Sequence, residues 1–126
     1  MKTTIKPNYS NSHIKEFLVK LNIAFVTANI EFITNNISDD VIWHIVGDRS
    51  VKNKENFIIA FKQMSNANTD ELTIDKIITH SNEAAVCGNI TMGTNKYAFS
   101  DFYEFSKTKK NQIKSITSYS IELKSK

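Results

Sequence analysis

The chain has 126 residues, 40% of them hydrophobic and 23% charged, which suits one globular domain with a core of its own and excludes collagen-like, wholly disordered and multi-domain architectures. The sequence has no run of about 18 apolar residues, so it predicts no membrane span, and its N-terminus lacks the apolar stretch of a signal peptide. We therefore expect a cytoplasmic protein without membrane contacts. The net charge of +3 rests on lysine. Arg49 is the only arginine, and proteins that recognise nucleic acids favour the bidentate guanidinium group of arginine. We therefore expect no nucleic-acid partner.

A long helical segment follows a polar start. Residues 1–11 predict a loose lead-in, and Ser12 can cap the helix after it. Apolar residues recur at helical spacing as far as Phe32. Because a second apolar set covers another side of the same segment, we expect two helices with a break near residues 28–30.

One strand and one further helix come next. Residues 38–40 predict a turn, and the almost wholly apolar run 41–46 predicts a strand covered on both faces. Asn53 can cap an amphipathic helix that extends to Met64. The stretch 65–70 is polar and predicts a loop.

The rest of the chain predicts consecutive strands over residues 72–80, 84–92, 97–105 and 113–123. Helices followed by an antiparallel meander are typical of the α+β class, and we interpret residues 1–126 as one domain. Long consecutive strands twist strongly, so helices laid across one face would leave a cone with an apolar interior and one open mouth. This shape favours a pocket for a small molecule.

The strand over residues 97–105 carries an acid among aromatic residues. Strand alternation puts Asp101 on one face with the rings of Tyr97, Phe99, Tyr103 and Phe105. Desolvation there would raise the pKa of its carboxyl, so that Asp101 could stay protonated and donate a hydrogen bond, or act as a base. The alternative is that Asp101 hydrogen-bonds a neighbouring Tyr or Ser and only fixes the core.

Trp43 and His44 are neighbours in the run 41–46 and therefore point to opposite faces of their strand. Trp43 can be a core residue and also a pocket wall that stacks on a ligand ring. A histidine between two apolar residues, as His44 is, is more often satisfied by local hydrogen bonds than catalytic. If it reaches the pocket, it is the titrating partner of Asp101 near neutral pH.

Other patterns argue against several kinds of site. The chain has no Gly-x-Ser-x-Gly elbow, P-loop or Rossmann glycine motif, which argues against nucleotide hydrolysis, kinase chemistry and hydride transfer and predicts no cofactor. One cysteine and three scattered histidines give no metal-ligand spacing, so we expect no metal. We interpret a lysine cluster as a solvated turn and strand face rather than a phosphate-binding patch; it consists of Lys107, Lys109, Lys110 and Lys114.

With these pieces in this order, the chain resembles the nuclear transport factor 2-like (SnoaL-like) superfamily from about Ser12 to Leu123. The resemblance is carried by the long N-terminal helix ending in ISDDVIWHIVG at 37–47, the KENF helix start at 54–57, EAAVCG at 83–88, SDFYEF at 100–105 and IKSITSY at 113–119. It implies a cone-shaped, curved antiparallel sheet wrapped by N-terminal helices.

The resemblance also implies a site and a partner surface. Asp101 lies where ketosteroid isomerases carry the protonated aspartate of their pocket, so its face would be the pocket face. The remaining pocket residues would be Trp43, Val86, Ile90, Met92, Phe99 and Tyr103, with Phe57 and Phe61 closing the pocket from the helix. The outer sheet face would form a homodimer through Cys87, Asn89, Phe102 and Tyr119.

Other parts of the isomerase site do not match this sequence. The position of the catalytic base falls at about His44 and that of the helix tyrosine near Leu21, which argues against steroid isomerisation. We therefore expect a pocket protein that binds a small, mostly apolar molecule. One alternative is a lyase-, isomerase- or cyclase-type enzyme that uses Asp101 and His44 as an acid/base pair on a carbonyl-containing substrate. Another is a dimerising module with a fully packed interior.

Overall fold

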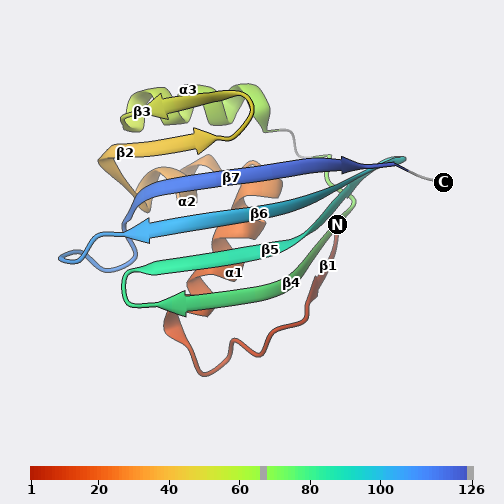
Figure 1. Cartoon of the computed structure of the whole chain (residues 1–126), viewed down its shortest axis with the longest axis horizontal. Helices are drawn as coiled ribbons and strands as arrows, with labels where there is room; N and C mark the ends of the chain where they lie inside the picture. The colour runs from red at the N-terminus through yellow and green to blue at the C-terminus, as the bar shows by residue number, and fades with distance from the viewer. Residues whose placement is uncertain (66–67, 125–126) are drawn as a thin grey trace.

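Residues 1–65 and 68–124 are described by the computed structural model, in which the helices lie in the first half of the chain and a run of strands follows them, as the sequence predicts for an α+β protein. The helices are α1 (His13–Val26), α2 (Ile30–Asn35) and α3 (Lys54–Met64). The strands are β1 (Lys2–Ile5), β2 (Ile37–Ile45), β3 (Arg49–Lys52), β4 (Glu71–His80), β5 (Glu83–Met92), β6 (Asn95–Phe105) and β7 (Ile113–Leu123) (Figure 1).

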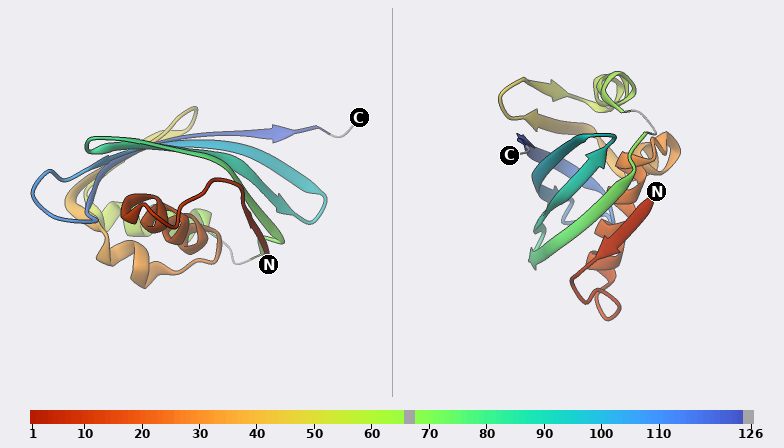
Figure 2. Two further views of the ribbon diagram at one scale, coloured as in Figure 1. Left: turned by 90° about the horizontal axis from the view of Figure 1, so that it is seen from below. Right: turned by 90° about the vertical axis from the view of Figure 1, so that its right-hand side faces the viewer.

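The strands of the described residues form one sheet, in the order β1-β4-β5-β6-β7-β2-β3. Strands β4 to β7 are the predicted antiparallel meander, while β2 pairs in parallel with β7 and β1 in parallel with β4. Figure 2 shows the sheet arching over the helices, which lie on its concave side. The predicted fold class, a curved sheet wrapped by helices, is confirmed.

Side-chain caps define where the helices begin. The Ser12 hydroxyl accepts a hydrogen bond from the Lys15 amide at 3.2 Å, and the Asn53 side chain accepts one from the Asn56 amide at 2.9 Å, as predicted. The expected break between two helices is also confirmed. Ala28 there has a φ of 57°, and the side chain of the next residue, Asn29, caps α2.

Three local predictions were wrong. Residues 2–5 are not a loose lead-in but strand β1, tied to β4 by backbone pairing that a polar sequence does not reveal. Residues 38–40 lie within β2, where an irregularity in the pairing with β7 accommodates turn-forming side chains. The run 41–46 is not covered on both faces, since His44 and Val46 are exposed, and its partner strand β3 was not expected. Of the predicted loop 65–70, residues 66–67 lie outside the described residues.

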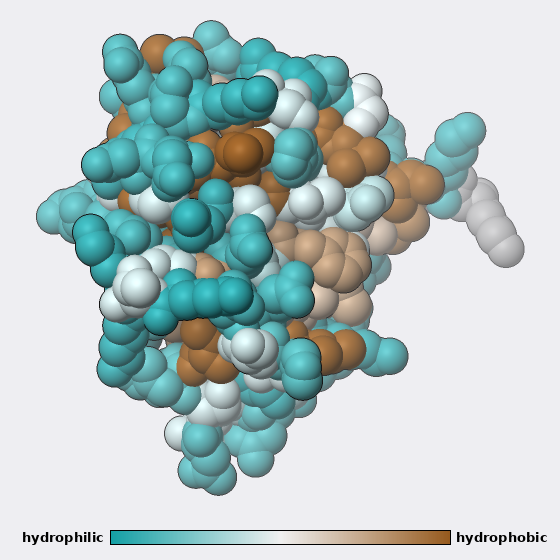
Figure 3. All heavy atoms as spheres, turned by 60° about the vertical axis from the view of Figure 1, so that its left-hand side comes forward, coloured by the Kyte–Doolittle hydropathy of each residue, from teal (hydrophilic) through white to brown (hydrophobic). Residues whose placement is uncertain are grey.

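The core fills the space between the helices and the concave face of the sheet. Leu18 and Leu21 of α1 and Val41, Ile74 and Ile116 of the sheet are almost completely buried there. On the face that Figure 3 shows, hydrophilic side chains predominate and apolar ones are visible between them. No helix within residues 1–65 and 68–124 is long and apolar enough to cross a membrane.

Candidate functional site

A cavity of about 170 Å³ lies between α1 and the concave face of the sheet. Its wall is mostly apolar and aromatic, and Asp101 is the one acidic or basic side chain among the described residues that line it. The lining residues are Asn22, Phe25, Val26, Trp43, Leu72, Ile90, Phe99, Asp101, Ile116, Ser118, Tyr119 and Ser120. We call this space the Asp101 cavity.

Asp101 is placed by the pairing of three strands. Across β6 and β7 it stands opposite Ser118, and across β6 and β5 it stands opposite Val86. Burial raises the pKa of the Asp101 carboxyl from 3.8 to about 6, and hydrogen bonding from Ser118 and Tyr103 offsets part of that rise. Both the protonated and the ionised carboxyl are therefore accessible near neutral pH, which acid/base work or hydrogen bonding to a ligand requires.

Tyr103 supports Asp101 from the inner side of the cavity. Burial, and then the charge of Asp101, raise the pKa of the Tyr103 phenol well above its usual value, so Tyr103 stays protonated and can donate toward the carboxyl. Asn22 of α1 holds the phenol from the other side, with its amide nitrogen 3.5 Å from the Tyr103 oxygen and 2.8 Å from the carbonyl of Leu18. The acid is thus backed by a hydrogen-bonded chain that begins on the helix.

Trp43 forms another part of the cavity wall. Its indole nitrogen donates to the Ser118 hydroxyl at 2.9 Å, and its ring stacks on Phe57 with a centroid distance of 4.7 Å. Phe25 contacts the Trp43 ring edge-on at 5.9 Å. Because the indole is held on both its polar and its apolar side, it gives the cavity a rigid aromatic wall.

No protein-family model and no curated protein matches the sequence, whereas many solved structures match its fold. A nuclear transport factor 2-like protein of unknown function from Cytophaga hutchinsonii is 22% identical, with a TM-score of 0.66 over 84% of this chain and 97% of its own. A proposed ketosteroid isomerase from Kribbella flavida is 14% identical, with a TM-score of 0.71 over 88% and 79%. A proposed SnoaL-like polyketide cyclase from Shewanella denitrificans is 8% identical, with a TM-score of 0.70 over 85% and 89%. This chain has the nuclear transport factor 2-like fold.

The nuclear transport factor 2-like fold brings together part of the predicted pocket. Trp43, Ile90, Phe99 and Asp101 line the Asp101 cavity. The other predicted residues lie behind or beside it: Phe57 backs Trp43, Phe61 packs edge-on against Phe25 at 5.3 Å, Val86 and Tyr103 are buried in the core, and Met92 is partly exposed near the end of β5.

His44 does not reach Asp101, so the predicted acid/base pair is wrong in its geometry. His44 is exposed, and its Nδ1 lies 2.8 Å from the hydroxyl of Ser50 across the β2–β3 pair. Its neighbour Trp43 takes the inward direction, and strand alternation then turns His44 to the opposite face. Asp101 is left as the acidic group of the cavity without a histidine partner.

Asn22, Phe25 and Ser118 were missed as site residues. A signal for Asn22 exists in the sequence, because it is an amide within an otherwise apolar stretch of helix, and a buried amide must find partners. Ser118 of β7 stands opposite Asp101 of β6, but the pairing register that brings the two residues together cannot be read from the sequence. In the described residues no group of three or more His, Cys, Asp or Glu side chains could hold a metal ion.

Proposed function

We propose that the Asp101 cavity binds a small, mostly apolar molecule that carries one hydrogen-bonding group. The observation behind the proposal is a single partly buried carboxyl, with its pKa raised to about 6, in an otherwise apolar and aromatic cavity. The carboxyl meets the polar group of the ligand, and Trp43, Phe25 and Phe99 contact its apolar body.

The volume limits the size of the ligand. A cavity of about 170 Å³ is comparable with engineered apolar cavities of roughly 150 Å³ that take up one benzene ring. A monocyclic alcohol, phenol or ketone therefore fits, and a steroid nucleus is too large. The Asn22 amide nitrogen is used by Leu18 and Tyr103, which leaves the amide oxygen of this lining residue available as an acceptor for the ligand.

Trp43 offers a direct test because it is the one tryptophan in the chain and lines the cavity. Phenol, cyclohexanol and cyclohexanone are titrated in turn, and the fluorescence of Trp43 is followed. We expect a saturable change for at least one probe, and weaker binding of that probe by Asp101→Asn. Asp48→Asn, which removes an exposed carboxyl from the β2–β3 turn, should bind as the parent does. Saturation that is equal in all three proteins would refute the role of Asp101.

The second candidate is an enzyme that moves a proton next to a carbonyl group, and the raised pKa of Asp101 favours it. The ionised carboxyl would accept an α-proton from a ketone and leave an enolate. The protonated carboxyl would exchange its proton with the solvent and return a solvent-derived proton to the α-carbon. Cyclohexanone in deuterium oxide tests this step, because turnover exchanges its α-protons for deuterons, visible by NMR. Exchange that Asp101→Asn abolishes supports the enzyme, and binding without exchange supports the binding protein.

The outer face of the sheet is the proposed homodimer surface. Phe102 and Tyr119 are 49% and 47% exposed there and contact each other edge-on, with Cys87 and Asn89 on the same face. Light scattering after gel filtration should give twice the mass of one chain, and Phe102→Asp should give a single chain. Ile59→Asp, at an exposed position of α3, is the matched control. A parent protein that elutes as one chain would rule out the homodimer.

A further inference from the structure

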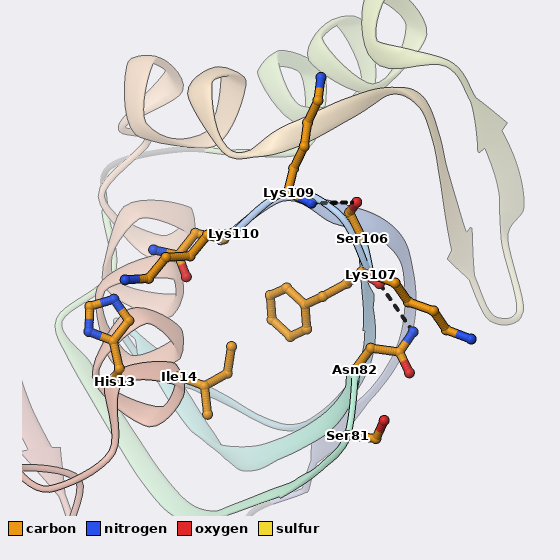
Figure 4. Close-up of a pocket in the computed structure, with 10 residues that line it drawn as sticks. His13, Ile14, Ser81, Asn82, Ser106, Lys107, Lys109 and Lys110 are labelled. Carbon is orange, nitrogen blue, oxygen red and sulfur yellow. Dashed lines mark hydrogen bonds between the residues drawn. The ribbon is translucent and has the colours of Figure 1, made fainter.

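A second, larger cavity lies at the C-terminal end of β6, where the β4–β5 and β6–β7 turns approach the start of α1 (Figure 4). Its volume is about 500 Å³. We call it the lysine cavity, and it is lined by His13, Ile14, Ser81, Asn82, Phe105, Ser106, Lys107, Lys109, Lys110 and Asn111. Lys107, Lys109 and Lys110 are exposed, as expected of a solvated turn, and they also border a concave site.

The charge in this cavity has one sign. Lys107, Lys109 and Lys110 line it with His13, and no acidic side chain is among the lining residues. None of these three lysines takes part in an ion pair within the described residues, whereas the nearby Lys114 lies 4.0 Å from Asp40. Unpaired ammonium groups around a concavity raise the local concentration of anions.

The side chains surround the cavity from several sides. Figure 4 shows His13 and Lys110 on one side, Lys107 on the opposite side and Lys109 above. The first turn of α1 also holds Glu16, but its carboxylate pairs with Lys20 at 3.3 Å and does not line the cavity. Figure 4 shows the ammonium ends of Lys107 and Lys109 directed away from the centre of the cavity, so these exposed lysines form a cationic rim around it.

The floor is apolar and its rim is fixed. Phe105 is buried, with its ring packed edge-on against Phe17 at 6.0 Å, and Ile14 is partly exposed beside it. Two hydrogen bonds join Asn82 to the backbone of Phe105. The Asn82 side-chain amide donates to the Phe105 carbonyl at 3.2 Å, and the Phe105 amide donates to the Asn82 carbonyl at 2.8 Å. The Ser106 hydroxyl accepts from the Lys109 amide at 3.1 Å, which holds the start of the lysine turn in place. An apolar floor with a cationic rim suits an amphiphilic guest.

We propose that the lysine cavity binds a small organic anion, a carboxylate or phosphate on a compact apolar body. Its volume falls within the range of about 300–1,000 Å³ that is usual for small-molecule sites. Its chemistry is complementary to that of the Asp101 cavity, where an anion would be repelled by the ionised carboxyl. Tyr103 and Phe105 stack between the two sites, with Tyr103 facing Asp101 and Phe105 lining the lysine cavity.

Amide NMR of the whole ¹⁵N-labelled chain, titrated with phenyl phosphate, tests the proposal. We expect saturable shifts at residues 13–14, 81–82 and 105–111, weaker saturation with inorganic phosphate, and none there with phenol. Replacing Lys107, Lys109 and Lys110 together by Gln should weaken phenyl phosphate binding about tenfold. The matched control replaces Lys76, Lys96 and Lys124 by Gln, with the same loss of charge on exposed positions elsewhere, and should change the affinity less than about twofold.

Three results would overturn the proposal. Equal weakening by both triple variants would mean general attraction to a basic protein. Equal affinity for inorganic phosphate would mean that the apolar floor is not used. Shifts confined to the surroundings of Asp101, or no saturation, would place the anion elsewhere or nowhere. Asp101→Asn should leave the phenyl phosphate affinity unchanged, so this test and the test of the Asp101 cavity fail independently.

Discussion

Asp101 and Ser118 face each other across β6 and β7, and the same serine hydroxyl accepts the indole hydrogen bond of Trp43 at 2.9 Å. Since a hydroxyl that accepts from one partner can still donate to another, Ser118 links the polar edge of the tryptophan to the carboxyl. Tyr103 and Asn22 extend this chain to α1. The acid of the cavity is therefore held by both layers of the fold.

Asp101→Asn should stabilise the protein at high pH. Because the pKa of Asp101 is raised in the folded state to about 6 from 3.8, the folded protein prefers the protonated acid, and this contribution is lost as the pH rises through about 6. A tenfold change in acidity corresponds to about 1.4 kcal/mol, so ionisation of this carboxyl costs the fold about 3 kcal/mol. In urea unfolding at about pH 8 we expect the variant to gain about 1–3 kcal/mol, and at about pH 4 to gain little.

Asp48→Asn is the control for that measurement, because the Asp48 carboxyl is exposed, and it should change the free energy of unfolding by less than about 0.5 kcal/mol at either pH. A loss of stability in Asp101→Asn at about pH 8 would contradict the prediction. It would show that the ionised carboxyl is a satisfied structural partner, the alternative that the sequence leaves open.

Ser118→Ala should raise the pH at which Asp101 titrates. The variant removes a donor that holds the pKa of the carboxyl down and leaves the Trp43 indole without its acceptor. We expect a further rise in the pKa of Asp101 and a loss of stability of about 1–2 kcal/mol. A carboxyl ¹³C titration by NMR and urea unfolding measure the two effects.

Ser120→Ala is the matched control for Ser118→Ala. Ser120 also lines the Asp101 cavity but stands opposite Phe99 instead of Asp101. Its removal should leave the Asp101 titration where it is. Equal changes in the two variants would mean that the serine hydroxyls act through general polarity, and the direct link between Ser118 and Asp101 would be lost.

Several features of the fold could be predicted because their causes are local. Caps at Ser12 and Asn53 are short-range hydrogen bonds, and the meander follows from strand alternation between turns. Strands β1 and β3 could not be predicted, since their stability comes from pairing with β4 and β2 rather than from their own side chains. The exposed side of β2, and with it the position of His44, depends on the same pairing.

Sequence alone could predict only those features of the site that depend on the alternation of side chains along a single strand. Asp101 and Phe99 share a face of β6 whatever that strand packs against, and both line the Asp101 cavity. Val86 and Met92 were chosen by the same alternation on β5, but the curvature of the sheet and the path of α1 determine which part of the face stays unfilled. The curvature of the sheet and the path of α1 depend on packing between the layers of the fold, and the residue pattern of a single strand does not report this packing.

Phe25→Ala should widen the range of ligands that the Asp101 cavity accepts. Phe25 lines the cavity and contacts Trp43, Phe57 and Phe61 edge-on, so its removal enlarges the space beside the indole. We expect a loss of about 2 kcal/mol in stability and a gain in affinity for naphthol relative to phenol, read from Trp43 fluorescence. Ile59→Ala, on the exposed face of α3, should change neither quantity. An unchanged preference between the two probes would show that the cavity collapses around the missing ring.

Gly88→Ala should prevent stable folding, because a methyl group at this position would overlap the backbone carbonyl oxygen of Thr73 on β4. The two strands approach closely next to an irregularity between Ile74 and Lys76, and backbone cannot move aside as a side chain can. We expect a loss of more than about 3 kcal/mol, seen as a large drop in melting temperature or as insoluble protein. Gly93→Ala is the control: it has open space around it and a φ of 61°, so it should cost only about 1 kcal/mol. If the two variants melt at the same temperature, the close approach of β4 and β5 at Gly88 does not limit the stability of the fold.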